Sequence, residues 1–439
     1  MIFAAALVVS IVVRFWLATR QVRHVARHRD AVPARFAERV PLAAHRRAAD
    51  YTVARVRLGM LEALVGALLL LGFTLFGGLQ ALLDTLAAWL PDHPFVRQIL
   101  FVAAVALIGA LVDLPIEWYR QFRLEQRFGF NRMTQRLFVA DALKGAAIAA
   151  ALGLPLVAVV LWLMRSAGGL WWLWAWAVWV TFNLVVLVLY PTVIAPMFNR
   201  FEPLSDATIR QRVEALLARC GFASKGLFVM DGSRRSAHGN AYFTGLGRSK
   251  RIVFFDTLLS RLSADEIEAV LAHELGHFHH RHVLVRIVLM FAASFAGLWL
   301  LGWLSRQGWF YQGLGVTPDA GEFEAAALVL FFLALPVFTF LLQPLFSWAS
   351  RRHEFQADAY AATHARAQDL ASALVKLYED NASTLTPDPI HSAFYDSHPP
   401  ASLRIAATIV AVSRISLTET ILSRFGDIAS NIASMDFVG

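Results

Sequence analysis

The sequence predicts an all-α polytopic membrane protein with a small α+β insert on its cytoplasmic side. Hydrophobic residues make up 57% of the 439 positions, and the mean hydropathy is +0.53. Both values are well above those of a soluble enzyme. Seven apolar stretches are each long enough to cross about 30 Å of hydrocarbon. Because Cys220 is the only cysteine, disulfides and a thiolate metal cage are excluded as organising elements.

The expected spans follow from these apolar stretches. The first is long, contains Arg14 and runs into a basic segment without a small-residue cleavage site, so it is interpreted as a spanning helix and not a signal peptide. The seven spans are expected at about residues 2–19, 58–82, 98–116, 145–164, 170–190, 283–304 and 325–348. The chain is divided accordingly. The first span and the basic segment occupy 1–57, spans two to five occupy 58–195, and the insert occupies 196–282. Spans six and seven occupy 283–348, and a cytoplasmic C-terminal region occupies 349–439.

Positive charge predicts the orientation of the spans. The segment 20–57 is rich in arginine, the next loop around Asp92 is poor in positive charge, and the loop around Arg132 is rich again. By the positive-inside rule, the N-terminus lies outside and the C-terminus lies in the cytoplasm. This bias also accounts for the net charge of +8, so nucleic acid is not an expected partner. Segment 20–57 itself should be a long cytoplasmic helix or helix pair. A connector is favoured for it over a clamp for anionic lipids.

A water-soluble insert is expected over about 205–282, after a proline-rich segment that ends the fifth span. It should begin with a helix over 206–219, capped by Ser205. Short strands are expected at Leu227–Met230 and Ile252–Phe255, and the glycine-punctuated stretch HGNAYFTGLGRSK between them should form a ribbon or an edge strand.

The next helix carries the strongest chemical signal in the chain. Ser263 and Glu266 form a capping-box pattern, which predicts that this helix begins directly after Ser263. The helix contains His273, Glu274 and His277 in the pattern H-E-x-x-H. Residues four apart lie on one helical face. The two histidines can therefore bind one Zn²⁺, with the glutamate beside the open coordination position.

The third ligand decides the subclass of zinc site. The pattern H-E-x-x-H-x-x-G-x-x-H is excluded because Val283 occupies its last position. Glu354 is expected instead, since the sixth and seventh spans form a hairpin that returns it to the membrane surface where His277 lies. Asp358, four residues later, could accept a hydrogen bond from a zinc-bound histidine. The alternative for this acidic pair is a solvated pair balanced by the two arginines before it.

Such a site predicts amide hydrolysis without a covalent intermediate. Zn²⁺ lowers the pKa of water toward about 7 and polarises a carbonyl. Glu274 would take the proton of the water and pass it to the leaving amine. His398 and Arg404, in the segment YDSHPPASLRI, are candidate donors to the developing oxyanion. The alternative for this segment is a rigid turn.

Three functions are compatible with the zinc motif. An endopeptidase at the cytoplasmic surface is favoured over an intramembrane-cleaving protease, because the acidic and histidine neighbours of the motif are too polar for the bilayer centre. A membrane scaffold or channel with structural zinc would need four protein ligands, and only three can be assigned. His279, His280 and His282 project in different directions on a helix and are interpreted as interfacial polar residues, not as a second metal site, with His280 on the ligand face.

Several motifs together resemble the type I CAAX prenyl proteases, which are integral-membrane zinc metallopeptidases of the gluzincin type. They are HELGH, EFQAD, the FGFN loop, APMFNRFEPL, NAYFTGLGRSKRIVFFDTLL and SHPPASLRI. The resemblance covers nearly the whole chain. It implies seven transmembrane helices in an α-barrel around a large water-filled chamber, with one Zn²⁺ at the cytoplasmic end. The residues implied at the active site are His273, His277 and Glu354 as ligands, Glu274 as base, Asp358 as partner of a ligand, and His398 and Arg404.

The resemblance also bears on the substrate. It implies that Asn240, Ala241, Tyr242, Phe243 and Thr244 form an edge strand that pairs with an extended peptide. Eukaryotic members remove the last three residues from isoprenylated C-termini. The Arg- and Ala-rich, Lys-poor composition suggests a GC-rich bacterium and its inner membrane, where prenylation is not expected. The expected substrates are therefore lipidated or membrane-associated polypeptides. The alternative is quality-control degradation of misfolded membrane proteins. The oligomeric state stays open.

Overall fold

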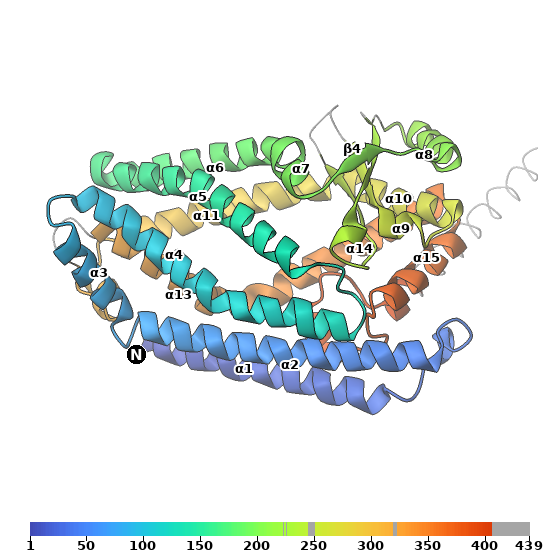
Figure 1. The fold of residues 1–439 in the computed structure, drawn as a ribbon, viewed down its shortest axis with the longest axis horizontal. Coiled ribbons are helices and arrows are strands. Elements are labelled where there is room, and N and C mark those ends of the chain that lie inside the picture. The colour runs from blue at the N-terminus through green and yellow to red at the C-terminus, as the bar shows by residue number, and fades with distance from the viewer. Residues whose placement is uncertain (223, 225, 245–250, 319–322, 406–439) are drawn as a thin grey trace, which may run out of the picture.

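The computed structural model describes residues 1–439 except 223, 225, 245–250, 319–322 and 406–439. Within the described residues, seven helical segments are long and apolar enough to cross a membrane, which confirms the expected number. In Figure 1 these segments extend from one end of the molecule, while the small sheet and its helices gather at the other end. The segments are Ile2–Arg27, Leu42–Phe73, Pro94–Glu125, Gln135–Ser166, Gly168–Phe198, His282–Leu304 and Phe323–His364.

The basic segment near the N-terminus forms the expected helix pair. Helix α1 (Ile2–His28) and helix α2 (Leu42–Phe73) run side by side, and a 3-10 turn, η1 (Ala34–Phe36), lies in the connection between them. The second span ends at Phe73 and not near residue 82. Gly77, at a φ of 77°, turns the chain into a separate short helix, α3 (Gly78–Trp89). That left-handed conformation favours glycine.

The remaining apolar helices follow the expected spans with shifted ends. They are α4 (Pro94–Tyr119), α5 (Gln135–Ser166), α6 (Trp171–Leu189), α11 (His282–Leu304) and α13 (Phe323–Thr339). Helices α4 and α6 each continue into a π-helical turn, η2 (Arg120–Glu125) and η4 (Tyr190–Ile194). The short connecting elements are η3 (Gly168–Leu170), α7 (Ala195–Phe198) and α12 (Gly308–Gln312).

The seventh span is not one regular helix. It was expected over 325–348, but α13 contains Pro336 and is followed by a 3-10 turn, η7 (Phe340–Leu342). Pro344, in the first turn of α14, lacks a backbone donor, and its ring crowds the carbonyl of Phe340 four residues earlier, which favours a break at η7. A second helix, α14 (Gln343–His364), then continues into the end of the molecule that holds the sheet.

The insert forms a four-stranded sheet with helices packed beside it. Its strands are β1 (Phe201–Pro203), β2 (Leu227–Met230), β3 (Ala241–Thr244) and β4 (Arg251–Phe255), in the order β1-β2-β4-β3. Strands β2 and β4 are parallel, and the other two pairs are antiparallel. The sheet therefore places β3 at an edge, as expected for this stretch. The sequence did not predict β1.

Helix α8 (Ala207–Arg219) begins where expected, but its cap is Asp206 and not Ser205. The Asp206 side chain accepts a hydrogen bond from the Ile209 backbone N–H at 3.0 Å, because it directly precedes the first helical turn. The 3-10 turn η5 (Gly232–Arg234) and the short helix α9 (Asp256–Leu259) complete the insert before the helix with the H-E-x-x-H pattern.

That helix, α10 (Ala264–His279), begins as predicted, with both capping-box hydrogen bonds between Ser263 and Glu266. The Glu266 carboxylate is buried and also accepts hydrogen bonds from Ser372 and Lys376, each at 2.7 Å. These partners lie on α15 (Ala367–Asp380). After α15, the chain forms α16 (Pro389–Tyr395), which leads into the His-Pro-Pro segment. Helix α10 is thus fixed at its start by hydrogen bonds to the C-terminal part of the chain.

Candidate active site

Three metal-ligand side chains from two helices meet beside the sheet. The Nε2 atoms of His273 and His277 on α10 lie 3.3 Å apart. On α14, Glu354 places Oε2 3.5 Å from His273 Nε2 and Oε1 3.4 Å from His277 Nε2. Among the described residues, this is the group of His, Cys, Asp or Glu side chains whose ligand atoms lie close enough to hold one metal ion.

The surroundings of these atoms fit a divalent cation. Glu354 is buried, and its Oε2 has no hydrogen-bond partner among the described residues. Its nearest charged neighbours, His273 Nε2 and Arg404 Nη1, both lie at 3.5 Å. A buried carboxylate oxygen without a hydrogen bond is stabilised by a cation placed close to it. Burial acts to lower the pKa of His273, but the neighbouring carboxylates of Asp358 and Glu354 outweigh it and raise this pKa to about 9. The site thus favours a positive charge at the place where a metal would lie.

A buried ion pair between Asp358 and Arg404 orients the expected metal ligand His273. Asp358 Oδ1 lies 2.8 Å from His273 Nδ1, so the carboxylate can hold the proton on this nitrogen and leave Nε2 free. The Arg404 guanidinium donates to both oxygens of Asp358, at 2.6 and 2.9 Å. Its Nη1 lies 3.5 Å from Glu354 Oε2. Both Arg404 and Asp358 are buried, so the pair is well placed to orient the ligands.

Gly276 sets the distance between the two ligand helices. A Cβ atom added there would meet Ala357 Cα at 2.8 Å and Tyr360 Cβ at 3.0 Å. Both residues belong to α14. Only glycine therefore allows α10 and α14 to approach as closely as the three ligands require.

We expect Gly276→Ala to weaken metal binding by about tenfold or more and to destabilise the protein by about 1–3 kcal/mol, the usual cost of overpacking. Titration with a competing chelator and thermal unfolding would measure the two effects. Gly297→Ala on α11 is the matched control, because its added Cβ would find its nearest neighbour at 3.9 Å. Unchanged metal affinity in Gly276→Ala would show that the helices can separate without cost.

The metal-ligand group opens onto a cavity of about 360 Å³, which also holds Glu274. His398 lines this cavity, and its Nε2 lies 3.4 Å from Glu354 Oε1. Its side chain is 62% exposed. Asn240 and Ala241, at the start of edge strand β3, line the same cavity. The structure therefore brings base, ligands, His398 and the edge strand together.

Tyr242, the next residue of the expected substrate strand, is placed differently. Tyr242 does not line the cavity, and its hydroxyl lies 3.9 Å from Met230 Sδ within the sheet. Phe243 and Thr244 continue β3 and pair in register with β4. Alternate residues of a strand face opposite sides, so Tyr242 is a packing residue of the sheet.

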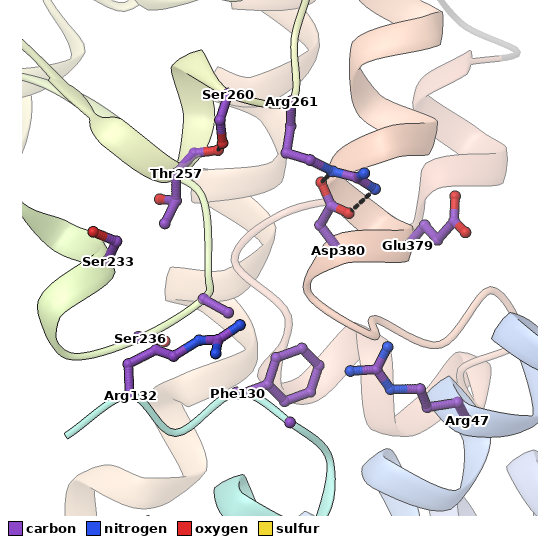
Figure 2. A pocket seen from close by; sticks show the side chains of 12 residues that line it. Arg47, Phe130, Arg132, Ser233, Ser236, Thr257, Ser260, Arg261, Glu379 and Asp380 are labelled. Atoms are coloured by element: carbon purple, nitrogen blue, oxygen red, sulfur yellow. Dashed lines mark hydrogen bonds and ion pairs between the residues drawn. The ribbon is translucent and has the colours of Figure 1, made fainter. Parts of the chain in front are cut away.

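A larger cavity adjoins this site, and another one adjoins that cavity in turn. A chamber of about 1240 Å³ shares Asn240 and His398 with the metal-site cavity. A cavity of about 500 Å³ adjoins the chamber at Ser236. Figure 2 shows that Arg47 and Arg132 approach Phe130 from opposite sides of this second cavity, and that Arg261 pairs with Asp380. Its lining is therefore polar and rich in arginine.

Sequence reasoning missed a hydrogen-bond chain behind the second histidine. His277 Nδ1 lies 3.0 Å from His282 Nδ1, and His282 Nε2 lies 2.9 Å from Gln356 Oε1. If Nε2 of His282 donates to the glutamine oxygen, its Nδ1 can accept the proton of His277 Nδ1. This arrangement leaves His277 Nε2 free for a metal. The interpretation of His282 as an interfacial polar residue is therefore incomplete.

His282 reaches this position because α10 ends at His279 and Arg281 adopts a left-handed conformation, with φ of 57°. The turn swings His282 back toward the ligand helix. An α-helix that continued without interruption through HFHHRH would not place the His282 side chain beside His277. The signal available in the sequence is the histidine five residues after His277 together with Gln356 inside EFQAD.

We expect His282→Ala to lower metal affinity by about 10- to 100-fold, the usual cost of losing the outer partner of a metal histidine. Competition with a chromophoric chelator would measure it. His280→Ala is the matched control, since His280 is exposed and its nearest aromatic contacts are His279, His282 and Tyr360. Equal affinities in the two variants would contradict the proposed orienting role.

The helix with the H-E-x-x-H pattern does not lie within a membrane span. Glu354 and Asp358 belong to the seventh candidate segment, Phe323–His364, but lie on α14, beyond the break at η7. Helix α10 precedes α11, which is the sixth candidate span, and none of the seven spans found in the described residues includes His273. This position disfavours an intramembrane-cleaving protease. The group of three ligands found among the described residues also disfavours a closed structural site with four.

Comparisons with known proteins agree with the site geometry. Residues 21–200 match the family described as CAAX prenyl protease N-terminal, five membrane helices, and residues 203–409 match peptidase family M48. The chain is 37% identical over 325 residues to the CAAX prenyl protease 1 homolog of Arabidopsis thaliana, covering 72% of this chain and 74% of the relative. It is 36% identical over 326 residues to CAAX prenyl protease 1 of Saccharomyces cerevisiae, covering 71% and 72%.

A solved structure shares the fold. The crystal structure of S. mikatae Ste24p superposes with a TM-score of 0.86 and 29% sequence identity, covering 92% of this chain and 98% of that one. The expected α-barrel membrane protease is thereby confirmed. The seven apolar helices make the protein an integral membrane protein. This chain belongs to the CAAX prenyl protease family within the M48 metallopeptidases, and it is a membrane metalloendopeptidase that acts on peptides.

Proposed function

We propose that one Zn²⁺ binds His273, His277 and Glu354 and that the protein hydrolyses a peptide bond close to the C-terminus of a prenylated or otherwise lipidated substrate. The observation that carries this proposal is the convergence of the three ligand atoms beside a cavity that also holds Glu274. Two imidazoles and one carboxylate are a donor set typical of catalytic zinc. When bound, Zn²⁺ supplies Lewis-acid polarisation of a carbonyl and of a water molecule.

The side chains of this chain supply the remaining chemistry. Burial raises the pKa of Glu274, which makes its carboxylate a stronger base than one in water. Glu274 takes the proton of the attacking water and passes it to the leaving amine. His398, exposed in the cavity, donates to the developing oxyanion. Arg404 is directed at Asp358 and acts as a positioning residue for His273.

The substrate backbone binds along β3. Within the described part of the chain, this strand pairs with β4 alone, so its other edge offers backbone groups next to Asn240 and Ala241 at the cavity. Strand addition supplies affinity through main-chain hydrogen bonds with little side-chain selectivity. The relatives named CAAX prenyl proteases support a prenylated peptide as the substrate.

We expect the N-terminus to lie outside the cell and the active site to face the cytoplasm. The arginine-rich segment 20–57 and the loop around Arg132 support this orientation by the positive-inside rule. Reporter fusions at Asp92 and Arg132 should report opposite sides of the membrane. Fusions that report the same side would contradict the proposed topology.

The processing role is tested by comparing the C-termini of membrane proteins in cells that express the parent or Glu274→Gln. Trimmed C-termini that depend on Glu274 would support processing. Degradation of misfolded membrane proteins is the competing function, and tolerance of diverse side chains by an edge strand favours it. Internal cuts in misassembled membrane proteins, without C-terminal trimming, would show that the protein degrades misfolded membrane proteins. They would contradict a role in C-terminal processing.

A further inference from the structure

An apolar groove opens between the first two helices beside the catalytic chamber. Its volume is about 230 Å³. On α2 its lining residues recur at spacings of three and four, which places them on one face. The apolar residues from the two helices are Phe15, Ala18, Val56, Gly59, Met60 and Ala63. The groove is thus lined mainly by apolar residues of the two packed helices α1 and α2.

The polar residues at this groove do not oppose an apolar ligand. Arg14 lines it, but its Nε donates to Ser10 Oγ at 3.3 Å and its guanidinium lies 3.9 Å from the centre of the Phe340 ring. His391 and Tyr395 of α16 close one side. Burial lowers the pKa of His391 to about 4, so its imidazole is neutral near pH 7.

The groove is continuous with the active-site chamber. Val56, Gly59, His391 and Tyr395 line both the groove and the chamber, and the chamber also contains His398. Tyr395 precedes His398 by three residues, so their Cα atoms are at most about 11 Å apart. A ligand group attached next to the reacting bond can therefore reach the groove through the chamber.

The groove also lies at a suitable level of the membrane. It contacts the end of the apolar part of α1, around Ala18, and the beginning of the apolar part of α2, around Gly59. Hydrocarbon gives way to polar surface at that level in both helices. The cavity in Figure 2, with Arg47, Arg132 and several hydroxyl groups, offers no comparable apolar surface.

We propose that this groove binds the distal part of the isoprenoid chain of a prenylated substrate, an inference that rests on the proposed function. In a C-a-a-X terminus the lipid is attached to the cysteine, so removal of three residues cuts the bond directly after the lipidated residue. The lipid must then find apolar surface close to the metal site. An apolar cavity of about 150 Å³ holds benzene, so 230 Å³ accommodates about two isoprene units. The first unit of a farnesyl chain would cross the chamber.

The test compares one peptide carrying farnesylated cysteine with the same peptide carrying S-methylcysteine. Ala63→Leu narrows the groove from α2, and Ala63 does not line the chamber. We expect kcat/KM for the farnesylated peptide to fall at least tenfold, since displacing even two methylene groups from apolar surface costs about that much. Cleavage of the methylated peptide should not change. Gly66→Leu is the matched control, since it adds the same side chain to α2 outside the groove with no atom within 4 Å of the new Cβ.

A photoreactive farnesyl peptide, cross-linked to the parent protein, gives a result that does not depend on any variant. Cross-links to α1, α2 or α16 would support the groove, and cross-links confined to other surfaces would overturn it. Retention of the full farnesyl preference by Ala63→Leu would also overturn it. If the parent cleaved both peptides equally well, the groove and the prenylated substrate would both be refuted, while the peptidase activity itself would stand.

Discussion

Glu274→Gln should abolish peptide cleavage while the protein keeps one metal ion per chain. Glu274 lines the metal-site cavity but is not among the three clustered ligand atoms. Glutamine preserves the shape of the side chain and removes its ability to accept a proton. Loss of a general base typically costs 10²- to 10⁴-fold in rate, and we expect kcat to fall by about 10³-fold or more.

The measurement combines elemental analysis of the purified variant with cleavage of a fluorogenic peptide. Metal content should equal that of the parent, and the thermal unfolding temperature should fall little. The matched control is Glu268→Gln, on the same helix but paired with Arg212 and Arg219 at the surface of the insert, which should cleave at the parental rate. Parental activity in Glu274→Gln would show that another group takes the proton.

Features encoded by local spacing were predictable from the sequence. A helix needs about 20 residues to cross the hydrocarbon core of a bilayer. Each of the seven apolar stretches has roughly that length, so the spans could be recognised from composition alone. The start of α10 followed from Ser263 and Glu266, because a capping box needs only four consecutive residues. The proximity of His273 and His277 followed from the helical repeat alone.

Glu354 required a topological argument and not a local one. Its approach to the histidines could be expected because α11 and α13 cross the membrane in opposite directions and return the chain to one surface. That argument fixes a side of the membrane, not a distance. The 3.4–3.5 Å separations between Glu354 and the histidines depend on the close contact of α10 and α14 at Gly276.

Other features depend on single backbone conformations or distant contacts. The positive φ of Arg281 turns His282 toward His277, and the positive φ of Gly77 sets the start of α3 as a separate helix. Neither can be read from periodicity. Arg404 was expected to meet an oxyanion, but its bidentate contact with Asp358 joins segments far apart in sequence. The sequence gives no pattern that distinguishes these two roles for a buried arginine.

Glu354→Gln should lose the metal together with the activity. The substitution keeps the volume of the side chain but removes the negative charge that faces both histidines. We expect metal affinity to fall by more than the roughly 10- to 100-fold that follows the loss of an outer hydrogen-bond partner. A chelator titration would measure it, and excess Zn²⁺ should restore only part of the cleavage.

Asp358→Asn is the matched control for this prediction, because it removes a charge one helical turn away on the same helix without removing one of the three clustered ligands. Its metal affinity should fall within the 10- to 100-fold range, because the asparagine oxygen can still accept the His273 Nδ1 proton. Arg404 would then lie beside a neutral partner, so the larger loss for Asp358→Asn should appear in thermal stability. If Asp358→Asn lost more metal than Glu354→Gln, Asp358 would be the third ligand. Glu354 would then be the residue with the supporting role.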